Sequence, residues 1–326
     1  MSDPRPTVVL IGLGGFGALW KDAIEACGLR VVAGIDPDPF ARADFHNAYA
    51  DHAPDVFERL ENFAGSVTFF IDSAPPAHRA RRVLSVIDRA ECVVVAKPAV
   101  ASLAALDDLM ATLGPRADKV RVAMQKRHLP AFEALQTLID EDALGKLTYI
   151  RSLVELDGTF WEPGTFWRTE MAHPNLWEGA IHQIDLLLQW CPDLAVTELS
   201  AFGWTPAGSA FAGISDFNVM MRDESGCVAQ IIARWSVSRL PITHYFEGVR
   251  IEGCHATAEV HGGRIYKDAA HRPVADEGEV FMDVAKLNTR LAPTLFDLEN
   301  PHPELGLAWH RRVLELADAI QTALER

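Results

Sequence analysis

The chain has 326 residues, of which 49% are hydrophobic and 23% are charged, as is ordinary for a folded globular protein. This length is enough for two domains with sizeable cores. The formal net charge of −15 argues against binding to nucleic acids or anionic membranes. No apolar stretch is long enough to span a bilayer, and Met1–Pro6 lacks the basic and apolar regions of a signal peptide. We therefore expect a cytoplasmic protein with neither a nucleic-acid nor a membrane partner.

The first predicted element is a short aliphatic strand, Thr7–Ile11, which leads directly into a Gly-x-Gly-x-x-Gly turn over residues 12–17. After a helical stretch, a second apolar run, Val31–Ile35, ends on Asp36. This order is typical of a dinucleotide-binding fold. The first glycine permits the tight turn, the second lets the backbone approach a pyrophosphate, and the third lets the helix lie against the sheet. The free N–H groups at the start of the helix, together with its dipole, favour bound phosphate.

The motif predicts a nicotinamide dinucleotide as the cofactor. Its predicted binding residues are Gly12, Gly14, Gly15, Phe16, Gly17 and Asp36. The Asp36 carboxylate would accept hydrogen bonds from the adenosine ribose, whereas a 2′-phosphate there would meet a like charge. NAD is therefore favoured over NADP. Arg42 lies close enough in sequence to reach a 2′-phosphate, so NADP stays an alternative.

Strands and helices alternate through the first third of the chain. The further elements expected there are strands at Arg30–Ile35, Thr68–Ile71, Val93–Ala96 and Arg121–Met124, and helices at Gly15–Cys27, Pro39–Ala48, Ala77–Ala90 and Ser102–Thr112. Alternation with continuously apolar strands predicts a parallel sheet covered on both faces. Residues 1–122 are therefore predicted to form an α/β domain, an NAD(P)-binding Rossmann domain.

The pattern changes in the second part of the chain, where strands follow one another. The expected elements are a helix at Pro130–Asp140, strands at Leu147–Glu155, Val196–Ala201, Asp216–Arg222, Cys227–Trp235, Tyr245–Ile251, Ala256–His261 and Arg264–Asp268, and a last helix from Pro303 to about Glu325. Asp223–Gly226 and Gly262–Gly263 carry hairpin turn residues. Consecutive strands joined by tight turns predict an α+β domain over residues 123–326, with a large, mostly antiparallel sheet. The segment 269–301 is expected to be irregular, as an arm or a lid.

The cysteines and histidines give no sign of cross-links or metal sites. The five cysteines are odd in number and widely scattered, with no CxxC pair, which indicates reduced thiols. The 12 histidines show no metal-ligand spacing. We therefore expect neither a disulfide framework nor a bound metal.

Three further segments resemble motifs of the Gfo/Idh/MocA (glucose–fructose oxidoreductase / inositol dehydrogenase) family. Val93–Pro98 is similar to the strand that ends in Glu-Lys-Pro in that family, with Ala96 in place of the glutamate. Ser73–His78 is a loose version of its Thr-Pro-x-x-x-His loop, and Glu178–Asp185 resembles its acid-x-x-x-His-x-x-Asp helix. The resemblance covers nearly the whole chain. It implies that the second domain binds the substrate. Because the open sheet of that domain would leave a broad face to be covered, we also expect a homo-oligomer, a dimer or a tetramer.

The resemblance makes Lys97 and His182 the catalytic acid–base groups. Oxidation of a secondary alcohol sends a hydride from carbon to the nicotinamide while a proton leaves the oxygen. A lysine at the carboxyl end of a parallel strand can stabilise the developing alkoxide, and burial beside the nicotinamide would lower its pKa. His182 titrates near neutrality and is a natural proton acceptor. Taken alone, the lysine could also be a solvated strand-end residue, and the histidine a core residue.

Further site residues follow from the same motifs. Glu178 precedes His182 by four residues, so both would lie on one face of an α-helix. This glutamate would orient the histidine or bind a substrate hydroxyl, and an ordinary helix-start acid is the alternative. Ser73, His78 and Lys97 are expected to contact the cofactor. The expected substrate-binding residues are Arg127, Trp167, Arg168 and Asp185, each of which could also serve packing or face solvent.

The resulting hypothesis is an oxidoreductase that uses NAD and no metal. It would transfer a hydride between the nicotinamide and a secondary hydroxyl or ketone of a sugar, cyclitol or related polyol. One alternative is a redox-neutral NAD-dependent sugar lyase or glycosidase, in which the cofactor oxidises the sugar transiently. The other is a non-catalytic dinucleotide-sensing regulatory protein. Ala96 favours the sensor, because any interaction that the glutamate of the family's Glu-Lys-Pro motif makes is absent here.

Overall fold

A computed structural model describes residues 4–157, 166–235, 245–261, 264–267, 273–275 and 283–326. Contacts within the chain divide it into two compact units. The first unit is Met1–Gln125 with Asp283–Leu314, and the second is Lys126–Met282 with Glu315–Arg326. This division differs from the sequence-based boundary at 122/123 mainly because it assigns Asp283–Leu314 to the first unit.

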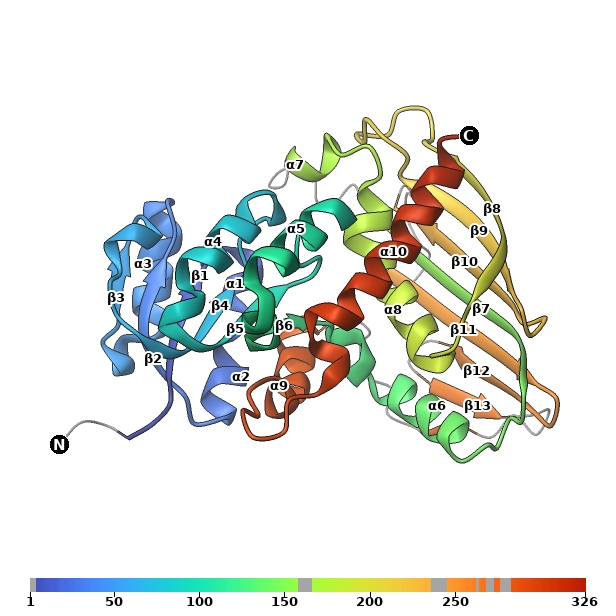
Figure 1. Ribbon diagram of the computed structural model, residues 1–326, viewed down its shortest axis with the longest axis horizontal. Helices are drawn as coiled ribbons and strands as arrows, with labels where there is room; N and C mark the ends of the chain where they lie inside the picture. Colours follow the sequence, from blue (N-terminus) through green and yellow to red (C-terminus); the bar gives the residue numbers. More distant parts are fainter. Residues whose placement is uncertain (1–3, 158–165, 236–244, 262–263, 268–272, 276–282) are drawn as a thin grey trace. The chain divides into compact units, whose positions relative to one another are not determined.

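The first unit contains a six-stranded parallel sheet in the order β3-β2-β1-β4-β5-β6 (Figure 1). Its strands are β1 (Thr7–Ile11), β2 (Arg30–Ile35), β3 (Asp55–Phe57), β4 (Val67–Asp72), β5 (Ala90–Ala96) and β6 (Val120–Ala123). This order is that of the Rossmann fold, which confirms the predicted fold class. Strands β1, β4 and β5 are buried almost throughout, because a parallel sheet has helices on both faces.

The helices of the first unit depart from the prediction at two places. They are α1 (Gly15–Ala18), α2 (Lys21–Ala26), α3 (Pro39–Ala48), α4 (Arg79–Val86), α5 (Leu103–Leu113) and α9 (Val284–Leu295), with 3₁₀ turns η1 (Ala50–His52), η2 (Leu60–Asn62), η3 (Pro76–His78), η4 (Ile87–Arg89), η5 (Gly114–Lys119) and η9 (Pro303–Leu305). The single helix expected over Gly15–Cys27 is wrong, because three-residue turns at Leu19 and Trp20 break it. The buried Trp20 ring packs on Phe296 of the same unit.

Helix α9 corrects the expectation of an irregular segment over residues 269–301. Asp283 caps the helix by accepting a hydrogen bond from the Lys286 N–H at 3.2 Å. Leu291 and Leu295 are fully buried in the core of the first unit. Pro293 lies inside the helix, and a proline normally argues against a helix interior. Burial of one apolar face outweighs that local signal.

The second unit contains an eight-stranded sheet in the order β14-β13-β12-β11-β7-β10-β9-β8. Its strands are β7 (Leu147–Leu156), β8 (Val196–Trp204), β9 (Asp216–Asp223), β10 (Val228–Arg234), β11 (Tyr245–Gly253), β12 (Thr257–His261), β13 (Arg264–Lys267) and β14 (Pro273–Ala275). Among the strand pairs of the described residues in this sheet, only β7/β10 is parallel, which confirms a mostly antiparallel sheet. The turn expected at Gly262–Gly263 lies outside the described residues.

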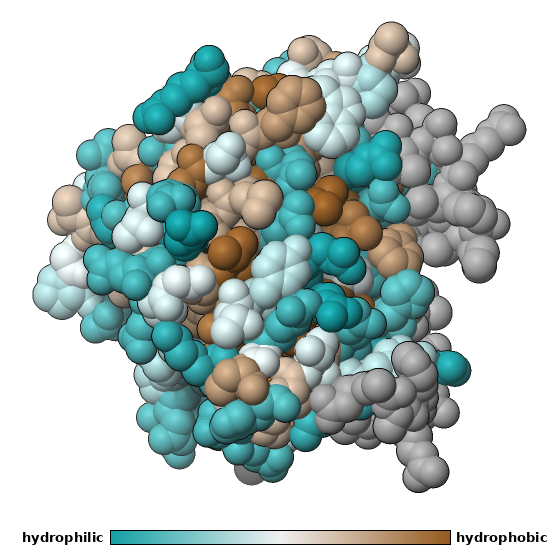
Figure 2. Space-filling view, turned by 90° about the vertical axis from the view of Figure 1, so that its right-hand side faces the viewer, coloured by the Kyte–Doolittle hydropathy of each residue, from teal (hydrophilic) through white to brown (hydrophobic). Residues whose placement is uncertain are grey.

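Helices of the second unit cover one face of its sheet (Figure 1). The helical elements of this unit are the 3₁₀ turn η6 (Gln125–His128), α6 (Pro130–Asp140), α7 (Phe166–Thr169), the π-helix η8 (Asn175–Ala180), α8 (Ile181–Trp190) and the end of α10 (Leu307–Leu324). Among the described residues no helix lies on the other face, where apolar and polar side chains mix (Figure 2). Phe202 and Met220 are exposed on strands β8 and β9. In the described part of the chain, no helix is long and apolar enough to cross a membrane.

Candidate cofactor and catalytic sites

The glycine turn after β1 is shaped for close approach of backbone to backbone and of a ligand to backbone. Gly12 has φ +81°, and a Cβ there would lie 2.5 Å from the Ala74 nitrogen. A Cβ on Gly17 would lie 1.9 Å from the Gly12 carbonyl oxygen, so the third glycine is needed for packing. At Gly14 and Gly15 a Cβ would meet no atom within 4 Å. The middle of the turn is therefore open, as binding of a pyrophosphate requires. Because α1 has only four residues, the phosphate-binding capacity rests on the turn's own N–H groups more than on a long helix dipole.

Asp36, at the end of β2, is fixed against this turn. One carboxylate oxygen accepts from the Leu13 N–H at 2.8 Å, and the other from the Asp38 N–H at 2.8 Å. A carboxylate has about four lone-pair positions, so two remain for the hydroxyls of a ribose. Arg42 donates to the backbone carbonyls of Asp36 and Pro37 at 2.7 and 2.9 Å, which holds its guanidinium at the same turn.

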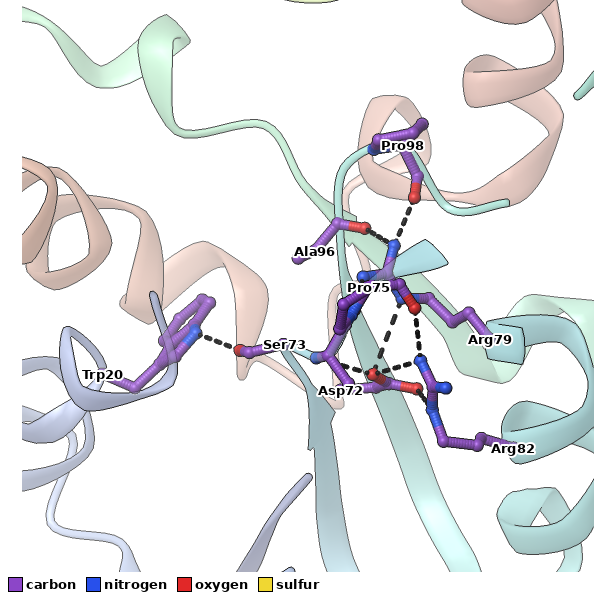
Figure 3. Close-up of polar contacts among 9 residues, drawn as sticks. Trp20, Asp72, Ser73, Pro75, Arg79, Arg82, Ala96 and Pro98 are labelled. Atoms are coloured by element: carbon purple, nitrogen blue, oxygen red, sulfur yellow. Dashed lines mark hydrogen bonds and ion pairs between the residues drawn. The ribbon is translucent and has the colours of Figure 1, made fainter. Parts of the chain in front are cut away.

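The loop after β4 meets the glycine turn at the carboxyl edge of the sheet. The Ser73 hydroxyl accepts from the indole N–H of Trp20 at 3.0 Å (Figure 3). Ala74 is the residue against which Gly12 packs. His78 ends η3 and is exposed. The structure therefore brings the turn, Asp36 and Ser73 to one edge of the sheet, where ligands of such folds bind.

Lys97 directly follows β5 at the same edge of the sheet. Its side chain is half-buried, whereas Pro98 and Ala99 are buried. The Lys97–Pro98 peptide bond is cis. Arg79, at the start of α4, donates to the carbonyl of Ala96 at 2.7 Å (Figure 3).

In the second unit, Glu178 lies in the π-helix η8 rather than in a continuous α-helix with His182. The assumption of continuous α-helical spacing is therefore wrong at this junction, and the face shared by the two residues stays a prediction. Glu178 is 6% exposed and pairs with the Arg168 guanidinium at 3.3 Å. That guanidinium also stacks over the Trp167 ring at 4.3 Å from its centroid. Trp167, Arg168 and Glu178 thus form one cluster.

The end of α10 holds the π-helix in place. His173 and Glu325 are 3.0 Å apart, and the Trp177 indole donates to Gln321 at 2.8 Å. The hydrogen bond with His173, followed by that with Gln321, holds the pKa of Glu325 below its ordinary value. A π-helix is rarely stable alone and is frequent at functional sites. These contacts give a tertiary reason for its presence here.

His182 lies in the first turn of helix α8 and is 9% exposed. One turn later, Asp185 forms a two-pronged ion pair with Arg127, in which the Nε–Oδ2 distance is 2.6 Å. Asp185 and Arg127 are 1% and 6% exposed. They therefore bind each other, and their assignment to substrate binding stays a prediction.

Several buried polar residues near these positions were not predicted from the sequence. Lys126 pairs with Glu247 at 2.8 Å, and the same carboxylate accepts from Gln183 on α8. Arg79 is 1% exposed beside the Lys97 loop. A single sequence marks such residues only as polar, and their burial depends on strands far away in the chain. Among the described residues, no group of three or more His, Cys, Asp or Glu side chains is placed to hold a metal ion.

The strand order, the glycine turn and the fixed acid define a two-domain α/β protein of the dinucleotide-binding class. Residues 132–264 match the model of the GFO/IDH/MocA C-terminal domain. This match shows that the second part of the chain carries a C-terminal domain of the GFO/IDH/MocA type.

Similar proteins include one relative in sequence and several in structure. The uncharacterized protein y4oX of Sinorhizobium fredii is 26% identical over 273 residues, which are 77% of this chain and 71% of that protein. An oxidoreductase from Agrobacterium radiobacter, solved with NAD+, L-tartaric acid and magnesium, has a TM-score of 0.82 at 13% identity. That match covers 99% of this chain and 97% of the other. A myo-inositol 2-dehydrogenase from Lactobacillus plantarum has a TM-score of 0.80 at 14% identity, covering 98% and 97%. At 13% and 14% identity, these two matches show that the chain shares its fold with both proteins.

Proposed function

We propose that the protein is an NAD-dependent oxidoreductase acting on a secondary hydroxyl or ketone of a sugar, cyclitol or related polyol. The observation that carries the proposal is the open glycine turn with Asp36 fixed 2.8 Å from the Leu13 N–H. The match to the GFO/IDH/MocA C-terminal domain and the NAD complex of a protein with the same fold support it. NAD is preferred to NADP because a 2′-phosphate would approach the Asp36 carboxylate.

The proposed mechanism assigns proton transfer to two side chains. Lys97, at the carboxyl end of β5, donates a hydrogen bond to the reacting oxygen and stabilises its negative charge. His182, at the start of α8, accepts the proton. NAD, held by the glycine turn and Asp36, would supply the acceptor for the hydride of the substrate carbon. No metal is needed for this acid–base chemistry.

The remaining polar residues hold the substrate and the catalytic helix. Arg168, stacked on Trp167, places positive charge beside Glu178, and this cluster offers both donors and acceptors to substrate hydroxyls. We assign Arg127 and Asp185 to substrate binding as well. Their mutual ion pair also fixes α8 one turn beyond His182. Ser73 and His78 remain the proposed cofactor contacts of the β4 loop.

The test is NADH formation across a panel of sugars, sugar acids and cyclitols, with NAD and NADP supplied in turn. We expect turnover with NAD at least about tenfold above that with NADP, since the Asp36 carboxylate repels a 2′-phosphate. Lys97→Ala is the negative control. Cofactor binding without NADH from any substrate would contradict the proposal. It would favour the redox-neutral sugar lyase or glycosidase if bound NAD copurifies and turns over, and otherwise the dinucleotide sensor.

We also propose a cytoplasmic homo-oligomer in which a second copy covers the open face of the eight-stranded sheet. Phe202 is 68% exposed there and its ring stacks on Trp204, and Met220 on the next strand is 47% exposed. Such a cluster on a sheet face is typical of an interface.

The expected result is that Phe202→Glu weakens self-association at least about tenfold, because a buried unpaired carboxylate is costly. Light scattering coupled to size-exclusion chromatography measures the change. Phe40→Glu is the matched control, since Phe40 is 79% exposed on the first unit. A monomeric wild type, or equal dimerisation of Phe202→Glu and wild type, would exclude this interface.

A further inference from the structure

A buried guanidinium binds the backbone on both sides of Lys97. The Arg79 Nη1 group donates to the carbonyl of Ala96 at 2.7 Å and also to the carbonyl of Pro98 (Figure 3). Its Nη2 group donates to the carbonyl of Ala74, in the loop after β4. One side chain thus joins the loop that carries Lys97 to the loop that packs on the glycine turn.

The charge of Arg79 is compensated below the loop. Arg79 and Asp72 are each 1% exposed, and the Nε–Oδ1 distance between them is 3.6 Å. Arg82 also binds Asp72, at 2.6 Å, and donates to the carbonyl of Pro75 (Figure 3). A buried cation is tolerated only when it is paired and hydrogen-bonded, and a planar guanidinium can serve several acceptors at once. Arg82 shares the anion but makes no hydrogen bond to Ala96 or Pro98 among those of the described residues.

A second anchor holds the same loop from helix α10. The Ala99 N–H donates to Nε2 of His310 at 3.1 Å, and His310 is 1% exposed. A nitrogen that accepts this bond carries no proton, so His310 is neutral with its proton on Nδ1. The peptide group between Pro98 and Ala99 is therefore bound at both its oxygen and its nitrogen.

We propose that Arg79 and His310 are positioning residues that set the backbone of Lys97 for proton transfer. Because peptide groups are planar, fixing the Ala96–Lys97 and Pro98–Ala99 groups leaves the intervening Cα atoms little freedom. The side chain of Lys97 then extends from a fixed backbone position at the edge of the sheet. The inference rests on the proposed function, in which Lys97 acts on the substrate oxygen.

The experiment compares Arg79→Gln and His310→Phe with the matched control Arg82→Gln. Arg79→Lys and His310→Gln are the conservative variants, which keep a donor or an acceptor. Each variant is checked for a cooperative melting transition and for NAD affinity by fluorescence. Two readouts follow: kcat and KM on a substrate found in the panel, and the rate at which an acylating reagent labels Lys97, measured by mass spectrometry.

We expect kcat to fall about 10- to 100-fold in Arg79→Gln and His310→Phe, because misplacing a catalytic group by about 1 Å costs that much. KM for NAD should stay within about threefold of wild type, since these substitutions leave the residues of the glycine turn in place. The rate of Lys97 labelling should change severalfold, because the backbone of Lys97 is no longer fixed. The conservative variants should recover part of kcat, and Arg82→Gln should stay within about twofold of wild type on both readouts.

Wild-type kcat and Lys97 labelling in a folded Arg79→Gln or His310→Phe overturn the proposal. If those two variants do not fold, the comparison uses the rate of Lys97 labelling in Arg79→Lys and His310→Gln. A labelling rate equal to that of wild type in both variants overturns the proposal, and a changed rate in either variant supports it. The labelling readout also separates this inference from the proposed function. Full turnover in Lys97→Ala would remove the catalytic role of the lysine, whereas altered labelling would still show that its backbone is set by Arg79 and His310.

Discussion

Lys97→Ala and His182→Ala should each lower kcat by roughly 10²-fold or more, because each removes a positioned proton-transfer group. The affinity for NAD should change little in His182→Ala, since the cofactor turn lies in the first unit. Steady-state kinetics on the best substrate of the panel measures the first effect, and fluorescence titration with NAD measures the second. His255→Ala is the matched control, because His255 is an exposed histidine of the second unit.

The double variant Lys97→Ala/His182→Ala adds a sharper test of the mechanism. Two groups that serve one proton-transfer step act as a unit, so the combined loss should be far smaller than the product of the single losses. Multiplicative losses would mean that the two residues act in separate steps. Full activity in either single variant would refute its catalytic assignment.

The parts of the site that the sequence predicted are those whose chemistry is local. The turn over residues 12–17 and the acid at Asp36 lie at fixed spacing within one strand–turn–helix–strand unit, in which Gly12 packs on the backbone of Ala74 and Gly17 on that of Gly12. The parallel and antiparallel sheets were predictable for a similar reason, since alternation and tight turns are visible in short windows.

The parts that were missed depend on contacts between distant segments. His310 binds Ala99 across 211 positions of the sequence, and Arg79 is an arginine that is buried on the same face of α4 as Val83 and Val86. The π-helix at Asn175–Ala180 is held by residues of α10, so its register could not follow from its own sequence. The continuous α-helix assumed from Glu178 to His182 was wrong for that reason.

Asp185→Ala should lower the free energy of unfolding by about 3–5 kcal/mol, because it leaves the Arg127 guanidinium buried without its counter-ion. Urea titration followed by circular dichroism measures the loss. The exposed pair of Arg222 and Glu198, 3.3 Å apart with side chains 55% and 68% exposed, provides the control. Glu198→Ala should cost no more than about 1 kcal/mol, since solvent screens such pairs.

The double variant Arg127→Met/Asp185→Leu separates a stabilising role from a functional one. Replacing both charges by apolar side chains removes the unpaired cation, so stability should return to within about 1–2 kcal/mol of wild type. If the ion pair serves only to hold α8, turnover should return together with stability. If stability returns while KM for the substrate stays raised, Arg127 or Asp185 contacts the substrate, as the sequence predicts. A double variant no more stable than Asp185→Ala would show that packing around the pair, rather than its buried charge, determines the loss.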